Sequence, residues 1–233
     1  MESLFRIFKC VVLIVQVIFS VAICSAIDKP QNCAGQPLYS SHGVESGPVI
    51  SPDGQKIVTM ERKEGKPDDY TIYHVQVGSK QLKARLTGFR TEILWSPDSK
   101  SFAVNQTEGG GGIGQRAYVF YIKSNHLHKI DVSTPVEKEF GRPVKCEVGV
   151  DPNTAVLEWL DPKRILVVAE IVNVSICKCP GTFMTYELSF PDLRILQIYS
   201  QAETRRRFSR SLGCELRPAD DSCARTWQKL LLL

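Results

Sequence analysis

A turn motif that occurs twice, at a spacing of 45 residues, constrains the fold more than any other feature. Residues 51–58 have the sequence SPDGQKIV, and residues 96–104 have SPDSKSFAV. Proline presets φ at the second position of a tight turn, aspartate hydrogen-bonds its own backbone, and glycine or serine closes the turn. The apolar, β-branched residues that follow predict a strand. A weaker third copy begins at Trp159, where WLDPKR echoes the WSPDSK that begins at Trp95. Repeats at this period are typical of propellers and arrays.

Each copy of the motif is followed by a second pair of strand patterns. The first unit has an alternating segment, a turn at Gly-Ser-Lys and a return segment, and the other two units have the same layout. The predicted strand pairs are 70–77 with 81–86, 117–122 with 127–130, and 183–188 with 195–198. Each unit therefore predicts about four short strands. Apolar residues do not keep helical spacing over three turns, and the best short helix candidate is the C-terminal segment 220–233.

The motif Trp-Ser-Pro-Asp-Gly/Ser-Lys, followed by an apolar strand, an aromatic strand and a Gly or Asn turn, resembles the TolB-type WD-like β-propeller repeat. The resemblance is clear over residues 48–132, and the third unit extends it to about residue 200. It implies an all-β, β-propeller-like fold of three to four four-stranded blades, and a role as an envelope or extracellular scaffold. It says little about function, because such blades serve many purposes.

The number of blades bears on whether the propeller closes. Closed propellers usually have four to eight blades. Residues 27–47 and 133–153 are the candidates for further, diverged strands. Otherwise the set of blades is open, and we expect its exposed apolar edges to be covered by another protein or by self-association.

The N-terminus has the layout of a signal peptide. Arg6 and Lys9 precede an apolar run from Cys10 to Ile23, and small residues end the run. The run is shorter than the ~20 residues that span a bilayer. We predict cleavage after Ala26, a secreted or periplasmic location, and no stable membrane span after cleavage. The alternative is an uncleaved anchor.

The predicted organisation has three parts: a signal peptide (1–26), a β-propeller-like repeat domain (27–203), and a basic, cysteine-containing C-terminal tail (204–233). Without the signal peptide, 27 basic and 24 acidic residues remain. This balance is too weak to indicate nucleic-acid binding. The basic run at Arg205, Arg206 and Arg207 is either a solvated face or an anionic-partner patch.

Six cysteines remain after the predicted cleavage, and an even number in an exported chain favours disulfide bonds. They are Cys33, Cys146, Cys177, Cys179, Cys214 and Cys223. The sequence does not choose among the fifteen possible pairings. The most local loop is the one that Cys214 and Cys223 would close.

A glycine-rich segment with the sequence EGGGGIGQ occupies residues 108–115 and formally contains Gly-x-Gly-x-x-Gly. A dinucleotide site needs a helix after the glycines, whereas the following residues predict a strand. Two interpretations remain: a slack connection between strands, or a loop that orders against a partner. In the second case the partner-binding residues are Gly109, Gly110, Gly111, Gly112 and Arg116.

The sequence contains no pattern that promotes catalysis. Neither His-Glu-x-x-His nor Gly-x-Ser-x-Gly occurs, and His126 and His128 lack an evident third metal ligand. We therefore predict no enzyme activity, no catalytic residue, no metal and no cofactor. Trp95 and Trp159 are predicted to fill core positions between blades. Asn105 and Asn173 match the glycosylation acceptor pattern.

These observations favour an exported, non-catalytic module that binds another protein through the loops at 62–70, 105–116 and 173–183. One alternative is an accessory propeller of a peptidase or hydrolase. Another is an inhibitor or immunity protein that blocks an enzyme in the same compartment.

Overall fold

The described part of the chain forms three four-stranded antiparallel sheets, each a simple meander. This confirms the prediction of an all-β, propeller-like fold, with three of the predicted three to four blades within the described residues. The computed structural model describes residues 39–44, 47–63, 70–107, 114–124, 126–141, 151–171 and 182–216, and the descriptions below refer to these.

We name the sheets blade 1, blade 2 and blade 3 in chain order. Blade 1 consists of β1 (Val49–Ile50), β2 (Lys56–Lys63), β3 (Tyr70–Val77) and β4 (Lys80–Thr87). Blade 2 consists of β5 (Phe89–Trp95), β6 (Ser101–Thr107), β7 (Gln115–Lys123) and β8 (His126–Asp131). Blade 3 consists of β9 (Asn153–Asp161), β10 (Arg164–Glu170), β11 (Phe183–Ser189) and β12 (Ile195–Ser200).

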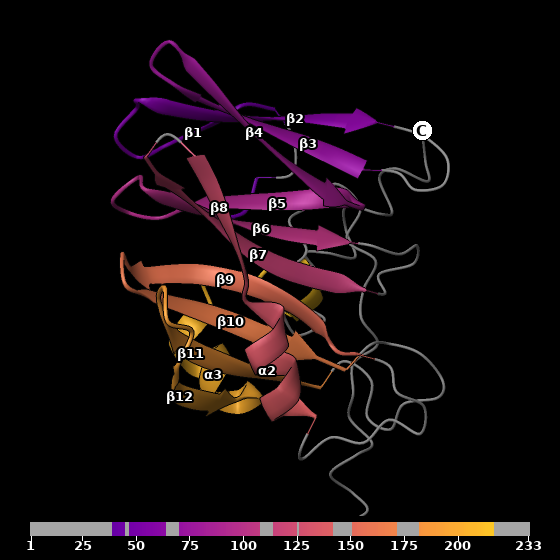
Figure 1. The fold of residues 1–233 in the computed structure, drawn as a ribbon. Helices are drawn as coiled ribbons and strands as arrows, with labels where there is room; N and C mark the ends of the chain where they lie inside the picture. Colours follow the sequence, from indigo (N-terminus) through magenta and orange to yellow (C-terminus); the bar gives the residue numbers. More distant parts are fainter. Residues whose placement is uncertain are drawn as a thin grey trace, which may run out of the picture.

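The blades are stacked in the order of the chain, with blade 2 between the other two (Figure 1). Blade 1 and blade 2 bury a shared core that includes Tyr73, Phe102 and Phe120. Blade 2 and blade 3 bury a second core that includes Val119 and Val167. Blades 2 and 3 are therefore covered on both faces, which explains why β10 is an almost continuous apolar run rather than an alternating one.

A tryptophan near the end of the first strand joins blade 2 to blade 1 and blade 3 to blade 2. The indole Nε1 of Trp95 in β5 donates to the carbonyl oxygen of Val49 in β1, at 3.1 Å. In the same way, Trp159 in β9 donates to the carbonyl oxygen of Leu94 in β5, at 3.2 Å. The prediction that both tryptophans pack between blades is confirmed by these contacts.

The repeated turns have the side-chain hydrogen bonds that their sequence predicts. Ser96 Oγ donates to Asp98 Oδ1 (2.8 Å) and accepts from the backbone N–H of Ser101 (3.0 Å). Ser99 has a left-handed backbone (φ 59°), a conformation in which the first repeat has glycine. Its hydroxyl accepts from the backbone N–H of Asp53 at 3.0 Å, so this serine links the two turns.

Two short helices occur where the sequence was not expected to form them. The prediction of further strands within 133–153 is wrong for its first part, because α2 (Ser133–Phe140) is helical. Asp131 Oδ1 accepts from the backbone N–H of Ser133 at 2.9 Å, and Val136 and Phe140 lie one turn apart in the core. α3 (Gln201–Phe208) starts with a capping box made by Ser200 and Glu203.

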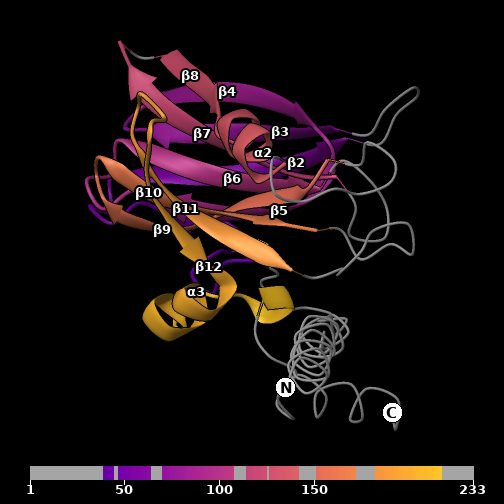
Figure 2. The same ribbon diagram turned by 90° about the horizontal axis from the view of Figure 1, so that it is seen from below.

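The outer face of blade 3 is covered by the two ends of the described chain. Tyr39 near one end, and Leu212 and Leu216 near the other, pack on the side chains that this face presents, with Phe208 at their margin. α3 lies against β11 and β12 (Figure 2). The outer face of blade 1 has no such cover within the described residues.

Among the helices that the structure describes, none has the length and apolar character needed to cross a membrane.

Candidate functional site

All three blades send a connection between their second and third strands toward the same side of the stack. β2, β6 and β10 end on this side, which we call the loop end (Figure 1). These connections are the loops that the sequence singled out, at 62–70, 105–116 and 173–183. Their central parts, 64–69, 108–113 and 172–181, lie outside the described residues. The site is therefore described from the strand residues that flank these loops.

Between blades 1 and 2, polar side chains fix the base of the loop end. Tyr73 Oη and Thr91 Oγ1 are 2.9 Å apart, and Gln106 Nε2 donates to the backbone carbonyl of Thr87 at 2.8 Å. Gly88 joins the blades with φ 124°, and a Cβ on it would lie 2.5 Å from the carbonyl oxygen of Thr107. Only glycine fits this close approach of two backbones.

Between blades 2 and 3, a chain of hydrogen bonds continues the same layer. The backbone N–H of Gln115 donates to Asn153 Oδ1 at 3.0 Å, and Asn153 Nδ2 donates to Tyr39 Oη at 2.9 Å. Tyr39 Oη in turn donates to Glu170 Oε2 at 3.0 Å. Because Gln115 begins β7 and Glu170 ends β10, this chain ties together the bases of two loops.

The Glu170 carboxyl group is almost completely buried, and this burial raises its pKa to about 8. The hydrogen bond from Tyr39 lowers the pKa, and the nearby charge of Glu215 raises it further. The pKa of Tyr39 is also raised, mainly by burial and then by the carboxylate of Glu170. The site therefore favours a protonated Glu170 at neutral pH.

A second buried carboxylate holds the N-terminal end of the described chain. Glu92 in β5 accepts from the backbone N–H groups of Tyr39 (2.9 Å) and Ser40 (3.2 Å), and from Asn105 Nδ2 (2.9 Å). Asn105 also bonds both the N–H and the carbonyl of Val156 across the blade interface. Asn105 is fully buried, so the folded chain has no room for a glycan there. The other acceptor, Asn173, lies outside the described residues.

The predicted partner-binding residues are placed only in part. Arg116 lies at the start of β7, where its guanidinium forms ion pairs with Asp131 (3.1 Å) and Glu137 (3.4 Å). These pairs tie β7 to α2, which is a structural role that the sequence did not indicate. Gly109, Gly110, Gly111 and Gly112 lie outside the described residues. A binding role for these five residues stays a prediction.

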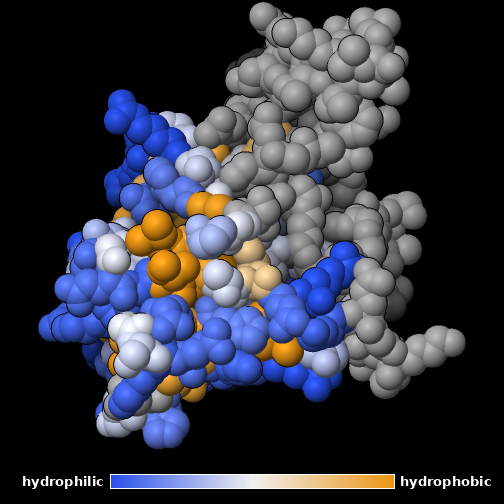
Figure 3. All heavy atoms as spheres, turned by 90° about the horizontal axis from the view of Figure 1, so that it is seen from above, coloured by the Kyte–Doolittle hydropathy of each residue, from blue (hydrophilic) through white to orange (hydrophobic). Residues whose placement is uncertain are grey.

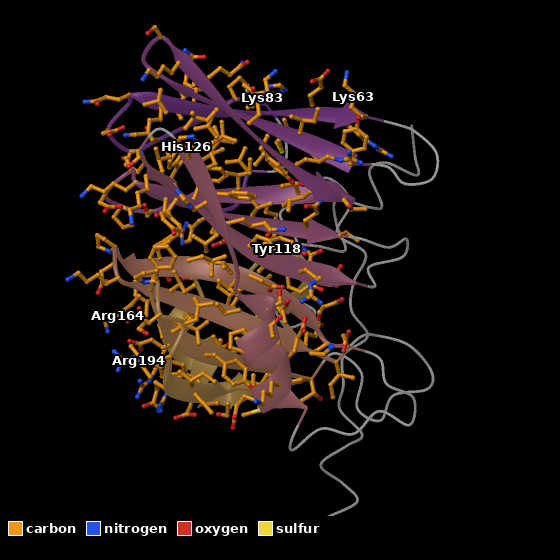
Figure 4. All side chains as sticks on the ribbon, viewed as in Figure 1. Lys63, Lys83, Tyr118, His126, Arg164 and Arg194 are labelled. Carbon is orange, nitrogen blue, oxygen red and sulfur yellow. The ribbon has the colours of Figure 1, made fainter. Side chains whose placement is uncertain are left out.

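The two histidines of β8 have ordinary surroundings. His126 Nδ1 lies 2.9 Å from the carbonyl oxygen of Ser124, and the ring of His128 stacks on Tyr121 with centroids 5.0 Å apart. His126 lies at the tip of β8 (Figure 4). Within the described ranges, no three His, Cys, Asp or Glu side chains are grouped to hold a metal ion.

The basic run of the C-terminal tail has two kinds of arginine. Arg205 lies over the ring of Phe183 (5.6 Å), and Arg207 lies over the ring of Tyr199 (5.3 Å). Arg206 and Arg210 are exposed. Arg205 and Arg207 therefore pack on aromatic side chains of blade 3.

Cys214 is buried against blade 3 and takes part in a disulfide bond. The other cysteines of the chain lie outside the described residues. Pairing with Cys223 therefore stays a prediction.

Sequence reasoning missed Tyr39, Glu92 and Glu170, which form the centre of the polar layer. Glu170 offered one signal: it is the single charged residue that closes the apolar run 165–169. A charged residue in a strand buried on both faces points to a polar network. Tyr39 has no such signal, because its partners are more than 50 residues away in the chain.

Comparison with known proteins does not assign the chain to a family. No family model matches it, and no curated protein matches it. One solved structure that it matches is the acylaminoacyl peptidase of Pyrococcus horikoshii, with a TM-score of 0.38 and 10% sequence identity. The match covers 70% of this chain and 26% of that one, so the chain spans about a quarter of that structure's length.

Proposed function

We propose that this chain is an exported, non-catalytic protein-interaction module of the TolB-like propeller type, and that it binds its partner at the loop end. The observation that carries the proposal is the common origin of the three loops. Each leaves the stack between the second and third strands of its blade, on the same side. Binding residues are often found on loops that a rigid scaffold positions.

The rigidity of the loop bases supports this proposal. Buried hydrogen bonds join blade 1 to blade 2 through Tyr73 and Thr91, and blade 2 to blade 3 through Gln115 and Asn153. A loop whose ends are fixed loses less conformational entropy when it binds than one whose ends also have to be ordered. The glycine-rich segment 108–113 then supplies backbone groups that can hydrogen-bond a partner closely.

Site-specific photo-crosslinking in the native compartment tests the proposal. A photoreactive residue is placed at 66, 110 or 176, one in each loop, and at Ser79 as a control. Ser79 lies in the turn between β3 and β4, on the side of the stack opposite the loop end. We expect one and the same protein to be captured from the three loop positions and not from Ser79.

A shortened loop gives the decisive comparison. Replacing Gly109 to Gly112 by Asn-Gly is expected to leave the urea unfolding curve unchanged while it lowers the crosslinking yield at 66 and 176. Equal capture from Ser79, or full capture after the loop is shortened, would contradict binding at the loop end.

A further inference from the structure

The outer face of blade 1 is an open sheet surface with an apolar strip. Ile50, Ile57 and Ile72 lie on this face, and Ile50 is 60% exposed. Figure 3 looks onto this end of the stack and shows hydrophobic side chains within a hydrophilic surround. Figure 4 shows Lys63 and Lys83 on the same blade. This face is separate from the loop end.

The repeat explains why Ile50 is exposed. Ile50 stands near the end of the first strand of its blade, in the position that Trp95 and Trp159 occupy in the other two blades. Each tryptophan reaches back to the preceding blade, and its Nε1 bonds a carbonyl of the inner strand there. Within the described residues no blade precedes Ile50, so blade 1 presents there the side that joins blades elsewhere in the stack.

The strand register places one acid and one base in the same row of this face. Glu61 in β2 pairs with Ile72 in β3, and Ile72 pairs with Arg85 in β4. The three therefore form one row across the sheet, with an acid at one end, an apolar residue in the middle and a base at the other end. Arg85 is exposed and lies over the ring of Tyr70 (3.7 Å). The Glu61 side chain is 44% exposed, and its carboxylate also pairs with Lys63 and with His74 (3.1 Å) on the same face.

We propose that this face binds the same face of a second copy of the chain, related by a two-fold axis that runs along β3. A rotation about that axis places β2 of one copy opposite β4 of the other and keeps each row in register. Glu61 of one copy then faces Arg85 of the other, twice, and Ile72 faces Ile72. An isologous contact of this kind needs a self-complementary surface, which the row supplies.

The neighbouring rows are compatible with the same arrangement. Lys83 in β4 shares a row with Thr59 in β2, and Lys63 in β2 shares a row with Thr87 in β4. The rotation therefore brings each lysine opposite a threonine and not opposite a second lysine. Like charges are kept apart, although the face carries more basic than acidic side chains.

Other occupants fit less well. Tyr39 and Leu216, which end the described chain, both pack on blade 3 at the far end of the stack. The outer face of blade 1 cannot bind the outer face of blade 3 of a second copy in a head-to-tail contact, because the chain itself covers the outer face of blade 3.

The size of the face indicates a weak dimer. Three strands of eight residues have a footprint of roughly 14 by 26 Å, from ~4.8 Å between strands and ~3.3 Å per residue. This is roughly 360 Å² per copy, or about 700 Å² in total, which is below the ~1,200 Å² at which standard specific interfaces begin. We therefore expect a dissociation constant of roughly 10–100 µM.

Sedimentation velocity across a concentration series tests the proposal on the purified chain. We expect a monomer–dimer equilibrium that weakens as salt is raised. Glu61→Arg alone and Arg85→Glu alone each place like charges opposite each other in both contacts. Each is expected to weaken the dimer by about tenfold or more.

Mixing the two single variants tests the symmetry. A Glu61→Arg chain carries arginine at both positions and an Arg85→Glu chain carries glutamate at both, so a mixed pair has two opposite-charge contacts. We expect the mixture to dimerise as strongly as the original chain, or more strongly, and we expect the double variant to regain self-association. Lys83→Glu is the matched control on the same strand, and it is expected to change the dimer less.

Three outcomes would overturn the proposal: a chain that stays monomeric up to about ten times the expected dissociation constant, single variants that dimerise unchanged, or a mixture that does not associate. Thermal unfolding of each variant shows that it is folded. Because the loop shortening at 109–112 leaves this face intact, loss of crosslinking and loss of the dimer are independent results.

Discussion

The Glu170 carboxyl group lies in a strand that is buried on both faces, and its only described hydrogen-bond donor is the Tyr39 hydroxyl. Its pKa is raised from 4.5 to about 8 in the folded chain. Between these values the unfolded chain releases the proton while the folded chain keeps it. Stability is therefore fully present below about pH 4.5 and is lost as the pH rises toward 8.

Replacing this group by a neutral one should remove the pH dependence. In Glu170→Gln, the amide oxygen can still accept from Tyr39, and no charge forms at high pH. We expect the free energy of unfolding of the variant, relative to the original chain, to rise between pH 5 and pH 8 by on the order of 3 kcal/mol. Urea unfolding at several pH values measures this difference.

Asp192→Asn, at an exposed position, is the control. Its free energy of unfolding relative to the original chain should be the same at every pH between 5 and 8. A Glu170→Gln variant whose relative stability does not change with pH would show that the carboxyl group ionises freely in the folded chain.

At this scale the sequence was informative about turns and poorly informative about polar contacts between blades. Pro52 and Pro97 mark turns because proline fixes a local dihedral angle, whatever the rest of the chain does. The role of Asn105 depends on Glu92 and on the backbone of Val156, which lies 51 residues further along. No local sequence pattern predicts hydrogen bonds between residues on different blades.

Among the elements, β5 and β9 differ from β1 in the residue that precedes the turn. Trp159 in β9 is buried and Trp95 in β5 is partly buried, and each indole donates to a carbonyl oxygen of the preceding blade, while the isoleucine of β1 is exposed. The same repeat position therefore has a structural role in two blades and not in the first.

An exchange of these residues tests that difference. Trp159→Ile removes an indole that is 7% exposed and leaves a cavity and an unpaired carbonyl. We expect a loss of about 2–4 kcal/mol in the free energy of unfolding. Ile50→Trp adds a ring on an open surface, and we expect a change within about 0.5 kcal/mol. Equal losses at the two positions would contradict the assignment of blade 1 as the first blade.

The two short helices were not predicted from the sequence, although one of them has a recognisable start signal. The capping box of α3, Ser200-x-x-Glu203, is a local signal for a helix start that could have been recognised. α2 is harder to predict, because it is only eight residues long and its N-cap residue, Val132, forms no side-chain cap hydrogen bond. Asp131 at the end of β8 accepts from its first backbone N–H. Short helices of this kind depend on packing more than on propensity.

Over the whole molecule, the two outer faces of the stack are made differently, and the strand patterns indicate this. β4 alternates between basic or polar residues and apolar ones, as expected for a sheet with one solvated face. β10 is buried along nearly its full length. The sequence predicted three to four blades, but it predicted neither which blade has an open face nor what covers blade 3. The cover of blade 3 was not predictable locally, because Tyr39 and Leu212 come from opposite ends of the described chain.

The cover of blade 3 should be essential to the fold. Leu212 is 1% exposed, and its backbone forms a bridge with Ser40. Leu212→Asp buries a charge in this cluster, and we expect a loss of about 3–5 kcal/mol together with binding of a hydrophobic dye. Ile57→Asp, on the open face of blade 1, is the control and should cost less than about 1 kcal/mol.

The covered face of blade 3 also limits how copies of this chain can combine. A stack of blades with two free faces is multivalent, and it could add copies at both ends into a fibre of unlimited length. Here residues of the chain itself cover the outer face of blade 3, so only the outer face of blade 1 is open to another copy. Any assembly through the sheet faces stops after a single step, and raising the concentration should give pairs in place of polymers.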